Sequence, residues 1–595
     1  MEKLRKEITK QALRLALETV KDPLQRELTM GDIFLSEGEL GLAELSFSTV
    51  LEKAEDLGVR VAARVGLARV LRARKAWEKA LRELDRAIEE LKETKAKAAL
   101  VSVVQEKAEV LKAQGKLNGA KACLEKLWEE INKEGSEPNL KAGVAFNLGL
   151  VLQLLLHHRE ACGLLEEAEE LWRPVNPVAS GLAKLAQVSS LLSIGKTSEA
   201  LVKVEEAEKN FANASVEPGL RKLLAWTRAL CFETLGRLEE AIDLKESALG
   251  TAPKASEFAD LARLCFSLGK PEKAQEYETH AEALLAAQKD VEPDAYFALF
   301  SLAMMRGDIS RAAKLMASLV DHYAGSPQTP GESFAVRMNQ ALLWFEQGFL
   351  GLAQKTVEEL LIELQELEGK GADVDPFLLD VLELRARLKN LANETEEAIL
   401  IYQSHLELAQ KLGRPMAIAA GYANLGQICL AQGNLQRAST LLEEAEKIYH
   451  RCKAKLSLGH LRLHLAKLSC LGNPENHEGM KVLEERVEEN KLIRSAKLDV
   501  AGLVTLAGMQ SQSSLFEEAS TNYLRALEIC GSVGLELSEI LIEALLGFME
   551  GERGHKELAE QWLSQTLEKM HTKGIDIPLT HYVAERLQEI TGLWW

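Results

Sequence analysis

A small residue recurs along almost the whole chain at intervals of 33 to 45 residues, and this period constrains the fold more than any other feature. The position five residues before it is glycine in nine of fourteen cases, and the position twelve residues before it is Gly or Ala in eleven. Self-similarity at a fixed period of this length is typical of a solenoid. The recurring positions are Ala43, Ala80, Ala120, Ala161, Ala200, Ala241, Ala274, Ala312, Ala353, Ala398, Ala438, Gly479, Ala519 and Ala559.

One period, residues 417–454, shows what each unit is expected to form. Apolar residues at helical spacing lie on both sides of a short turn at Gly433, which predicts two amphipathic helices. Glycine at the turn supplies the backbone freedom for one helix to end and the next to begin. Gly426 and Ala438 are small where the two helices are expected to cross. Such a pair buries its apolar face only by stacking on its neighbours, so the pattern has to repeat.

The pattern Asn-Leu-Gly, Gln-Gly-Asn-Leu and two later alanines, seen at 424–445, resembles the tetratricopeptide repeat. The period near 40 residues is similar to that of kinesin light chains, LGN-type polarity proteins, MalT-type regulators and Rap-type receptors. The resemblance covers about residues 25 to 570. It implies an all-α, right-handed superhelical solenoid of about fourteen helix-turn-helix repeats with capping helices.

Pro- and Gly-rich stretches suggest how the array is divided. We expect an N-terminal capping helix in residues 1–24, a first sub-array over 25–325 and a second over 332–570, with the break in Ala324–Ser333. A further candidate break is Gly369–Pro376. Residues 571–595 are expected to form a C-terminal capping helix, over Leu579–Ile590, and a tail that ends in two tryptophans.

Charge and cysteine usage narrow the class of partner. The formal net charge of −18 argues against nucleic acid or an anionic membrane as the main partner, since both need clustered cations. The eight cysteines are scattered without CxxC spacing, which indicates a reduced, cytoplasmic chain. The longest apolar stretch, Val144 to Leu156, is too short to cross a bilayer. We therefore expect no membrane insertion.

Three motifs that could carry chemistry are better explained by the repeat. Gly195-Lys196-Thr197 resembles the end of a phosphate-binding loop but falls at a repeat turn. Cys162 has His157 and His158 nearby, yet it follows a repeat alanine and is expected to begin a second helix. His460 and His464 lie one helical turn apart, without a carboxylate or thiol at zinc-site spacing. We expect no catalytic residue, metal or cofactor, and hence no enzyme.

The tetratricopeptide resemblance points to a groove lined by the first helix of each unit. It implies that an asparagine nine residues before the turn contacts an extended peptide, because an amide both donates and accepts hydrogen bonds. Asn147, Asn339 and Asn424 occupy that position. The alternative is that each asparagine hydrogen-bonds a neighbouring helix of its own chain.

Two other features are candidate contacts for a partner. A basic stretch in the second unit, in which Arg64 and Arg72 are central, could dock an acidic protein or another copy of the chain. Interspersed Glu78, Glu83 and Asp85 leave an internally paired helix pair as the alternative. The terminal Trp594 and Trp595 fit either a binding anchor or a lid over the last helix.

The function that these observations favour is non-catalytic. We expect a scaffold or adaptor that binds a partner protein or peptide along its groove; homo-oligomers are possible. The alternative is a ligand- or peptide-responsive regulatory subunit that controls a separate effector. A stand-alone hydrolase built on Cys162 and His158 is a third hypothesis.

Overall fold

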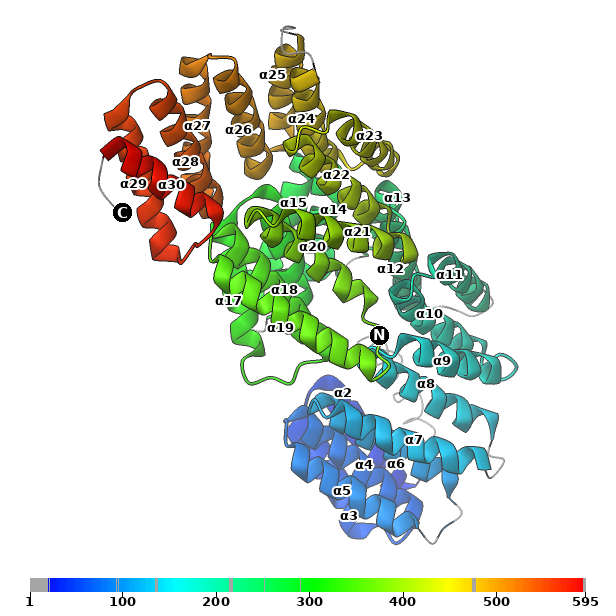
Figure 1. Cartoon of the computed structure of the whole chain (residues 1–595). Coiled ribbons are helices and arrows are strands. Elements are labelled where there is room, and N and C mark those ends of the chain that lie inside the picture. Colours follow the sequence, from blue (N-terminus) through cyan, green and yellow to red (C-terminus); the bar gives the residue numbers. More distant parts are fainter. Residues whose placement is uncertain are drawn as a thin grey trace. The chain divides into compact units, whose positions relative to one another are not determined.

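The computed structural model describes residues 20, 22–92, 94, 96–133, 137–212, 218–250, 252–288, 291–472 and 478–591. In this part of the chain helix follows helix and no strand occurs (Figure 1), so the all-α prediction is confirmed. The predicted C-terminal capping helix is α30 (Pro578–Thr591). Residues 1–19 of the predicted N-terminal cap, and Trp594 and Trp595, lie outside the described residues.

The helices form consecutive pairs, each joined by a short turn. The first helices of the pairs are α2 (Pro23–Glu37), α4 (Leu57–Ala73), α6 (Lys97–Ala113), α8 (Pro138–Leu154), α10 (Pro177–Ser193), α12 (Pro218–Thr234), α14 (Ala255–Ser267), α16 (Pro293–Arg306), α18 (Pro330–Glu346), α20 (Asp375–Leu391), α22 (Pro415–Ala431), α24 (Lys455–Gly472), α26 (Ala496–Gln512) and α28 (Glu536–Glu552). The second helices are α3 (Leu40–Lys53), α5 (Trp77–Leu91), α7 (Leu117–Lys133), α9 (His158–Trp172), α11 (Thr197–Ala212), α13 (Leu238–Ser247), α15 (Pro271–Ala287), α17 (Ile309–Tyr323), α19 (Leu350–Gly369), α21 (Thr395–Lys411), α23 (Leu435–Cys452), α25 (Glu478–Asn490), α27 (Phe516–Val533) and α29 (Lys556–Lys573). One short 3-10 helix, η1 (Lys491–Ile493), follows α25.

The turn position predicted from the sequence has the backbone conformation that favours glycine. Every turn residue within the described ranges has a positive φ, from 58° at Lys75 to 85° at Gly38. Glycine reaches this left-handed region at little cost, which explains its frequency there. At Lys75, Leu156, Asn393 and Ser514 a residue with a side chain adopts the same conformation. The repeat therefore fixes the turn geometry even where the sequence departs from glycine.

We expect Lys75→Gly to stabilise the protein. An L-residue in the left-handed region costs about 1–2 kcal/mol, and part of this gain is offset by the greater backbone freedom of glycine when the chain is unfolded. Lys75 is exposed, so no packing is lost. Urea unfolding followed by circular dichroism should show a rise of up to about 1 kcal/mol. Arg82→Gly, on an exposed face within α5, should instead lower the stability; a loss in both variants would contradict this account.

The repeat alanines form the tightest contacts of the core. All thirteen have a relative exposure of 0%. The side chain four residues after each alanine packs on the small residue of the preceding helix where that residue is glycine. A Cβ atom added at Gly426 would lie 2.8 Å from Leu442, and one at Gly149 would lie 2.8 Å from Leu165. Small residues at these positions let the two helices of a pair approach each other.

The chain separates into two compact units. The first comprises the residues up to Thr227 together with Pro327–Gly331 and Gly371–Asp373, and the second comprises Arg228–Ser326, Glu332–Lys370 and the residues from Val374 onwards. The division into sub-arrays at residues 325–332, expected from composition, stays a prediction.

Within each unit the array curves towards the even-numbered helices. Even-numbered neighbours such as α2 and α4, α4 and α6, α14 and α16, and α24 and α26 contact each other directly, in addition to the helices between them. Neighbouring odd-numbered helices in the described part of the chain share no contact of similar extent. Helices on the concave side of a curved stack are closer together than those on the convex side. We call the even-numbered helices inner and the odd-numbered helices outer.

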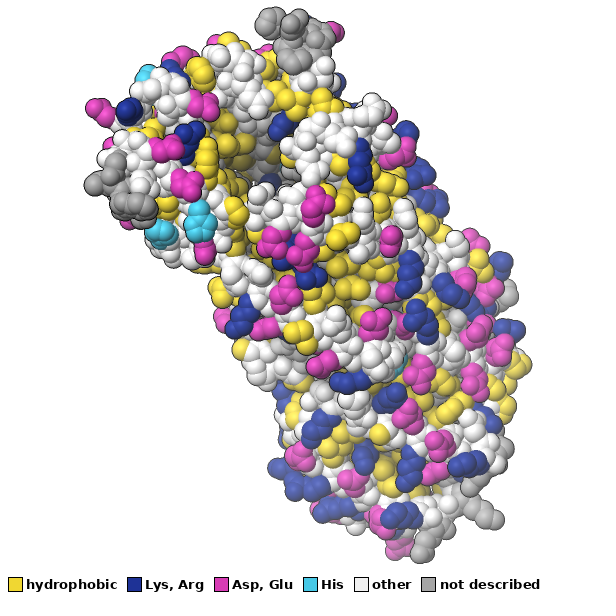
Figure 2. Space-filling model, viewed as in Figure 1, with side chains coloured by type: hydrophobic (Ala, Val, Ile, Leu, Met, Phe, Trp, Pro, Cys, Tyr) yellow, Lys and Arg dark blue, Asp and Glu magenta, His cyan; other side chains and the backbone are white. Residues whose placement is uncertain are grey.

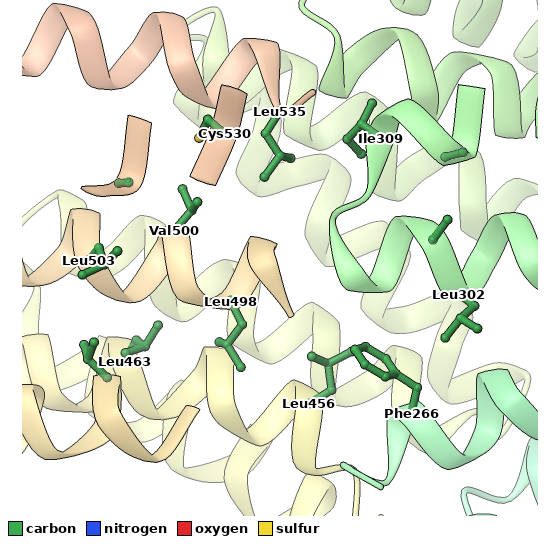
Figure 3. Packing of buried hydrophobic residues seen from close by; sticks show 14 of the residues in the cluster. Phe266, Leu302, Ile309, Leu456, Leu463, Leu498, Val500, Leu503, Cys530 and Leu535 are labelled. Carbon is green, nitrogen blue, oxygen red and sulfur yellow. The ribbon is translucent and has the colours of Figure 1, made fainter. Parts of the chain in front are cut away.

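The second unit winds far enough for segments distant in sequence to pack together. Helix α14 contacts α24, α16 contacts α26, and α17 contacts α27. One hydrophobic cluster spans both sides of this contact. Figure 3 shows Phe266 of α14 beside Leu456 of α24, and Ile309 of α17 facing Leu535, which precedes α28. The core of this unit therefore joins repeats that are not neighbours along the chain.

Polar groups and turn glycines complete this contact, which we call the turn-to-turn contact. The Ser495 hydroxyl donates a hydrogen bond of 2.9 Å to the carbonyl oxygen of Met305, 190 residues earlier. The Lys453 ammonium pairs with Glu239 at 2.5 Å. A Cβ atom at Gly307 would lie 2.7 Å from the backbone nitrogen of Lys497. Glycine at this turn is thus required by the neighbouring backbone as well as by its own φ.

Candidate functional site on the inner helices

The three predicted groove asparagines occupy equivalent places in the structure. Asn147 in α8, Asn339 in α18 and Asn424 in α22 are each the tenth residue of an inner helix, and each is half-buried. Asn147 belongs to the first unit and the other two belong to the second. None of the three amides makes a hydrogen bond to another described residue. The alternative bond to a neighbouring helix is therefore not seen within the described residues, and contact of these amides with a ligand stays a prediction.

The same face of other inner helices carries charged and titratable side chains. In α24 the sixth and tenth residues are His460 and His464, and in α20 the sixth and thirteenth are Asp380 and Arg387. Residues four and seven apart lie on one side of an α-helix. Figure 2 shows a hollow in the region where Figure 1 places α22, α24, α26 and α28, walled mainly by hydrophobic side chains. The candidate site consists of His460, His464, Asp380 and Arg387 in the second unit, together with Asn339 and Asn424.

A buried carboxylate holds two cations of this site in place. One oxygen of Glu346, at the end of α18, accepts a hydrogen bond of 3.0 Å from Arg387 and one of 2.5 Å from Lys497. Glu346 is only 4% exposed. Burial alone would raise the pKa of Glu346, but the Lys497 and Arg387 cations outweigh it and lower the pKa to about 2. The carboxylate therefore stays ionised and fixes three helices, α18, α20 and α26.

Asp380 is perturbed in the opposite direction. Desolvation within the concave face raises the pKa of Asp380 to about 7, and the negative charge of Glu383 adds to the effect while Arg414 opposes it. By its accessible surface Asp380 is an exposed residue. It is therefore a carboxyl group that gains or loses its proton near neutral pH on a face that a ligand can reach.

We expect Asp380→Asn to change how stability depends on pH. Because the pKa of Asp380 is raised in the folded state, the folded protein binds this proton more tightly than the unfolded chain does. Its contribution to stability is therefore lost as the pH rises from about 4 to about 7. Asparagine does not titrate, so this loss is absent from the variant. The free energy of unfolding of the variant, relative to that of the wild type, should therefore rise between about pH 4 and about pH 7. Urea titrations at several pH values measure the difference. The matched variant Asp321→Asn, an exposed carboxylate on outer helix α17, should leave the profile unchanged; parallel profiles for wild type and Asp380→Asn would contradict the assignment.

The two histidines of α24 are half-buried and lack an acidic partner. Burial, together with the charges of Lys497 and His464, lowers the pKa of His460 to about 3. Burial likewise lowers the pKa of His464 to about 4, with a further contribution from Lys467. Both rings are neutral at physiological pH. Within the described residues no three His, Cys, Asp or Glu side chains come close enough to hold a metal ion.

The first unit contains the cysteine and histidine considered above as a nucleophilic pair. The Nδ1 atom of His158 lies 3.3 Å from the Ser190 hydroxyl. Burial raises the pKa of Cys162 to about 11, so the reactive thiolate is absent at neutral pH. Ser190 is fully buried. The cluster lacks the activated, accessible nucleophile that covalent catalysis needs. Gly195 has a φ of 79° and is a repeat turn, as the sequence predicts.

The predicted basic contact is largely paired inside the first unit. Arg64 donates to Glu83 at 2.6 Å and to Glu90 at 2.8 Å, and Arg72 donates to Glu106 at 3.0 Å. Such internal pairing is the alternative that the interspersed acidic residues suggested. A docking role for Arg64 and Arg72 stays a prediction.

Sequence reasoning found part of this site. The asparagines were identified by their distance from the turn, but His460 and His464 were considered only as metal ligands. The signal that could have assigned them to the inner face is their spacing from the start of α24: His464 is its tenth residue, like Asn424 in α22. Lys497 and Glu346 are 151 residues apart, and no local pattern relates them.

Repeated helix pairs that curve around an inner face define a helical solenoid of the kind that presents a binding surface. Residues 257–458 match the family described as the MalT-like TPR region, and residues 28–95 match the tetratricopeptide repeat family. Both stretches are therefore similar to tetratricopeptide repeats, in agreement with the resemblance of the sequence.

Solved structures with some similarity were also found. The APC/C hetero-tetramer Cut9–Hcn1 has a TM-score of 0.45 at 14% identity, and the match covers 95% of this chain and 96% of that one. A Rap protein complexed with competence and sporulation factor has a TM-score of 0.39 at 12% identity, covering 65% and 98%. The apo quorum sensor NprR from B. thuringiensis has a TM-score of 0.36 at 13% identity, covering 54% and 98%. No curated protein sequence matches the chain.

Every helix in the described ranges is too short or too polar to cross a lipid bilayer.

Proposed function

We propose that this protein is a non-catalytic scaffold or adaptor of the cytoplasm, whose inner helices bind an extended segment of a partner protein or peptide. The observation that carries the proposal is the set of three half-buried amides at the tenth position of α8, α18 and α22, which make no hydrogen bond to described residues. An amide side chain can donate to and accept from a peptide backbone at once. The eight free cysteines support a reducing compartment.

Affinity capture with matched variants tests this function. Tagged wild type, an Asn147/Asn339/Asn424 triple alanine variant and an Asn118/Gln354/Gln436 triple alanine variant are incubated with native lysate, and bound proteins are quantified by mass spectrometry. The control residues are exposed amides on the outer helices α7, α19 and α23. A stoichiometric partner that the inner variant loses and the outer variant keeps would support the proposal. Equal capture by all three proteins would exclude the inner amides as contacts.

A second candidate function, a ligand- or peptide-responsive regulatory subunit that controls a separate effector, is favoured by the turn-to-turn contact of the second unit. This contact includes a hydrogen bond and ion pairs such as Lys453 with Glu239. A ligand that binds one winding of the unit more tightly than another would shift the population by its difference in affinity. Small-angle scattering distinguishes the two functions: a ligand that compacts or opens the protein favours the regulator, and an unchanged envelope favours the scaffold.

A further inference from the structure

The inner face of α24 presents a row of nitrogen-bearing side chains without a carboxylate partner. His460, His464 and Lys467 occupy the sixth, tenth and thirteenth positions of this helix and are all half-buried. Their spacing of four and three residues places them on one side of the helix. None of the three makes a hydrogen bond or an ion pair within the described part of the chain. We call these residues the α24 strip.

Several acidic groups of the surrounding helices are paired with cations outside the strip. Helix α24 packs against α14, α22, α23, α25 and α26. Of these, α22 contributes no charged side chain. Glu446 of α23 lies 3.5 Å from His450 and 3.8 Å from Arg462, and Arg462 is on the side of α24 opposite the strip by its helical spacing. In α14, Asp260 pairs with Lys245 and Arg263, and in α25, Glu488 pairs with Lys491 and Glu489 with Arg486. Glu484 and Glu485 of α25 make no ion pair within the described residues, and Asp499 of α26 keeps one buried oxygen without a hydrogen bond, with Lys491 and Glu488 as the charges that act on it.

The charges that do act on the strip are positive. Lys497, at the start of α26, and Lys467 both disfavour protonation of the nearer histidine, in addition to burial. Lys497 is already bound to Glu346, but Lys467 is not neutralised by any described group. A chain with a net charge of −18 thus has a local surface that favours an anion.

We propose that the α24 strip binds carboxylate groups of the segment held on the inner face. This inference rests on the proposed function and names the chemistry of the bound segment. Carboxylate oxygens accept hydrogen bonds from the imidazole N–H groups and from the Lys467 ammonium, and such charge-assisted bonds are strong where water is partly excluded. Asn424 lies one inner helix away, at the same helical position as His464, and is suited to the peptide backbone of the same segment.

Binding of a carboxylate should also take up protons. A bound anion favours the charged imidazolium, so the pKa of each ring is higher in the complex than in the free protein. Affinity therefore rises as the pH falls through the pKa of the complex. Protonation of Asp380 on α20 also removes a negative charge from the inner face as the pH falls, and Asp380→Asn is the background in which the histidine effect is isolated.

The test uses the full chain with its histidines labelled with carbon-13 at Cε1. Two variants, His460→Gln and His464→Gln, assign the two NMR signals. Three acetylated peptide probes are titrated to millimolar concentration: tri-glutamate with an amidated C-terminus, tri-glutamine with an amidated C-terminus, and tri-glycine with a free C-terminus. The first probe carries side-chain carboxylates, the second carries none, and the third carries only a terminal carboxylate.

The proposal expects tri-glutamate to shift both assigned signals and to raise the pKa of both rings, and tri-glutamine to leave them unchanged. Signals shifted by tri-glycine as well would identify a terminal carboxylate as a sufficient ligand. Lys467→Gln should weaken tri-glutamate binding about tenfold, the typical effect of losing a hydrogen bond to a charged group. His571→Gln, on the exposed side of outer helix α29, should not change it.

Unchanged His460 and His464 signals with both carboxylate probes would overturn the proposal, as would equal shifts with tri-glutamate and tri-glutamine. The proposed function fails separately, when the Asn147/Asn339/Asn424 variant captures every partner as well as wild type does. A partner lost in that variant but unaffected by Lys467→Gln would keep the scaffold function and remove the carboxylate preference.

Discussion

Gly307→Ala is expected to lower the unfolding free energy of the second unit by about 2–5 kcal/mol, since two penalties add. The turn residue has a φ of 81°, where an L-residue costs about 1–2 kcal/mol. The new Cβ would also lie 2.7 Å from the backbone nitrogen of Lys497, and overpacking of this kind costs about 1–3 kcal/mol. A backbone atom cannot move aside as the end of a side chain can. Urea unfolding measures the loss.

Gly433→Ala separates the two penalties. Gly433 has a φ of 74° at the equivalent turn, but an added Cβ there meets no atom within 4 Å. Gly433→Ala should therefore lower the unfolding free energy only by the conformational penalty of the left-handed turn. Hydrogen exchange of the first turn of α26 should quicken in Gly307→Ala and not in Gly433→Ala, because only the former disturbs the turn-to-turn contact. Equal losses in the two variants would show that α16 and α26 are not packed together in solution.

Gly479→Ala is expected to destabilise the protein although alanine is the residue of every other repeat at this position. A Cβ atom at Gly479 would lie 3.0 Å from both the Cα and the nitrogen of Cys470. Helices α24 and α25 are therefore in backbone contact where other pairs are separated by a methyl group. Forcing them apart should cost about 1–3 kcal/mol, which outweighs the better helix propensity of alanine.

Gly351→Ala provides the control for this prediction. Gly351 lies in helix α19, and an added Cβ there meets no atom within 4 Å. The same substitution should stabilise the protein by about 0.5–1 kcal/mol, because alanine loses less conformational freedom in a helix. Urea midpoints that move in opposite directions for Gly351→Ala and Gly479→Ala are the expected result. A stabilising Gly479→Ala would mean that the missing alanine has no structural cause.

The sequence predicted most of the local structure because the repeat determines it locally. The turn position, the buried alanine and the small residue twelve positions earlier depend on contacts within one helix pair, and the structure confirms all three at Gly433, Ala438 and Gly426. Even Lys75, which departs from glycine, keeps the turn conformation. The sequence shows that glycine replaces the repeat alanine at position 479. It does not show the cause, which is the close approach of α25 to Cys470.

The contacts between distant repeats could not be predicted in the same way. Which repeats meet depends on the rotation between successive pairs, and small differences in that rotation accumulate along the array. Contacts such as Ser495 with Met305, and Lys497 with Glu346, follow from that accumulated winding. The charged part of the inner face depends on it as well, because Arg387 and Lys497 meet on one carboxylate from different repeats. The asparagine positions were accessible to sequence reasoning because a single repeat places them.

Photo-crosslinking tests most directly whether the inner helices bind the partner. Benzoylphenylalanine is introduced at Gln427, an exposed residue of inner helix α22 three positions after Asn424, and separately at Gln436, an exposed residue of outer helix α23. Each protein is irradiated in native lysate and its adducts are identified by mass spectrometry. We predict a partner adduct at Gln427 and none of comparable yield at Gln436. An adduct that forms only at Gln436 would contradict it and would place the binding surface on the outer helices.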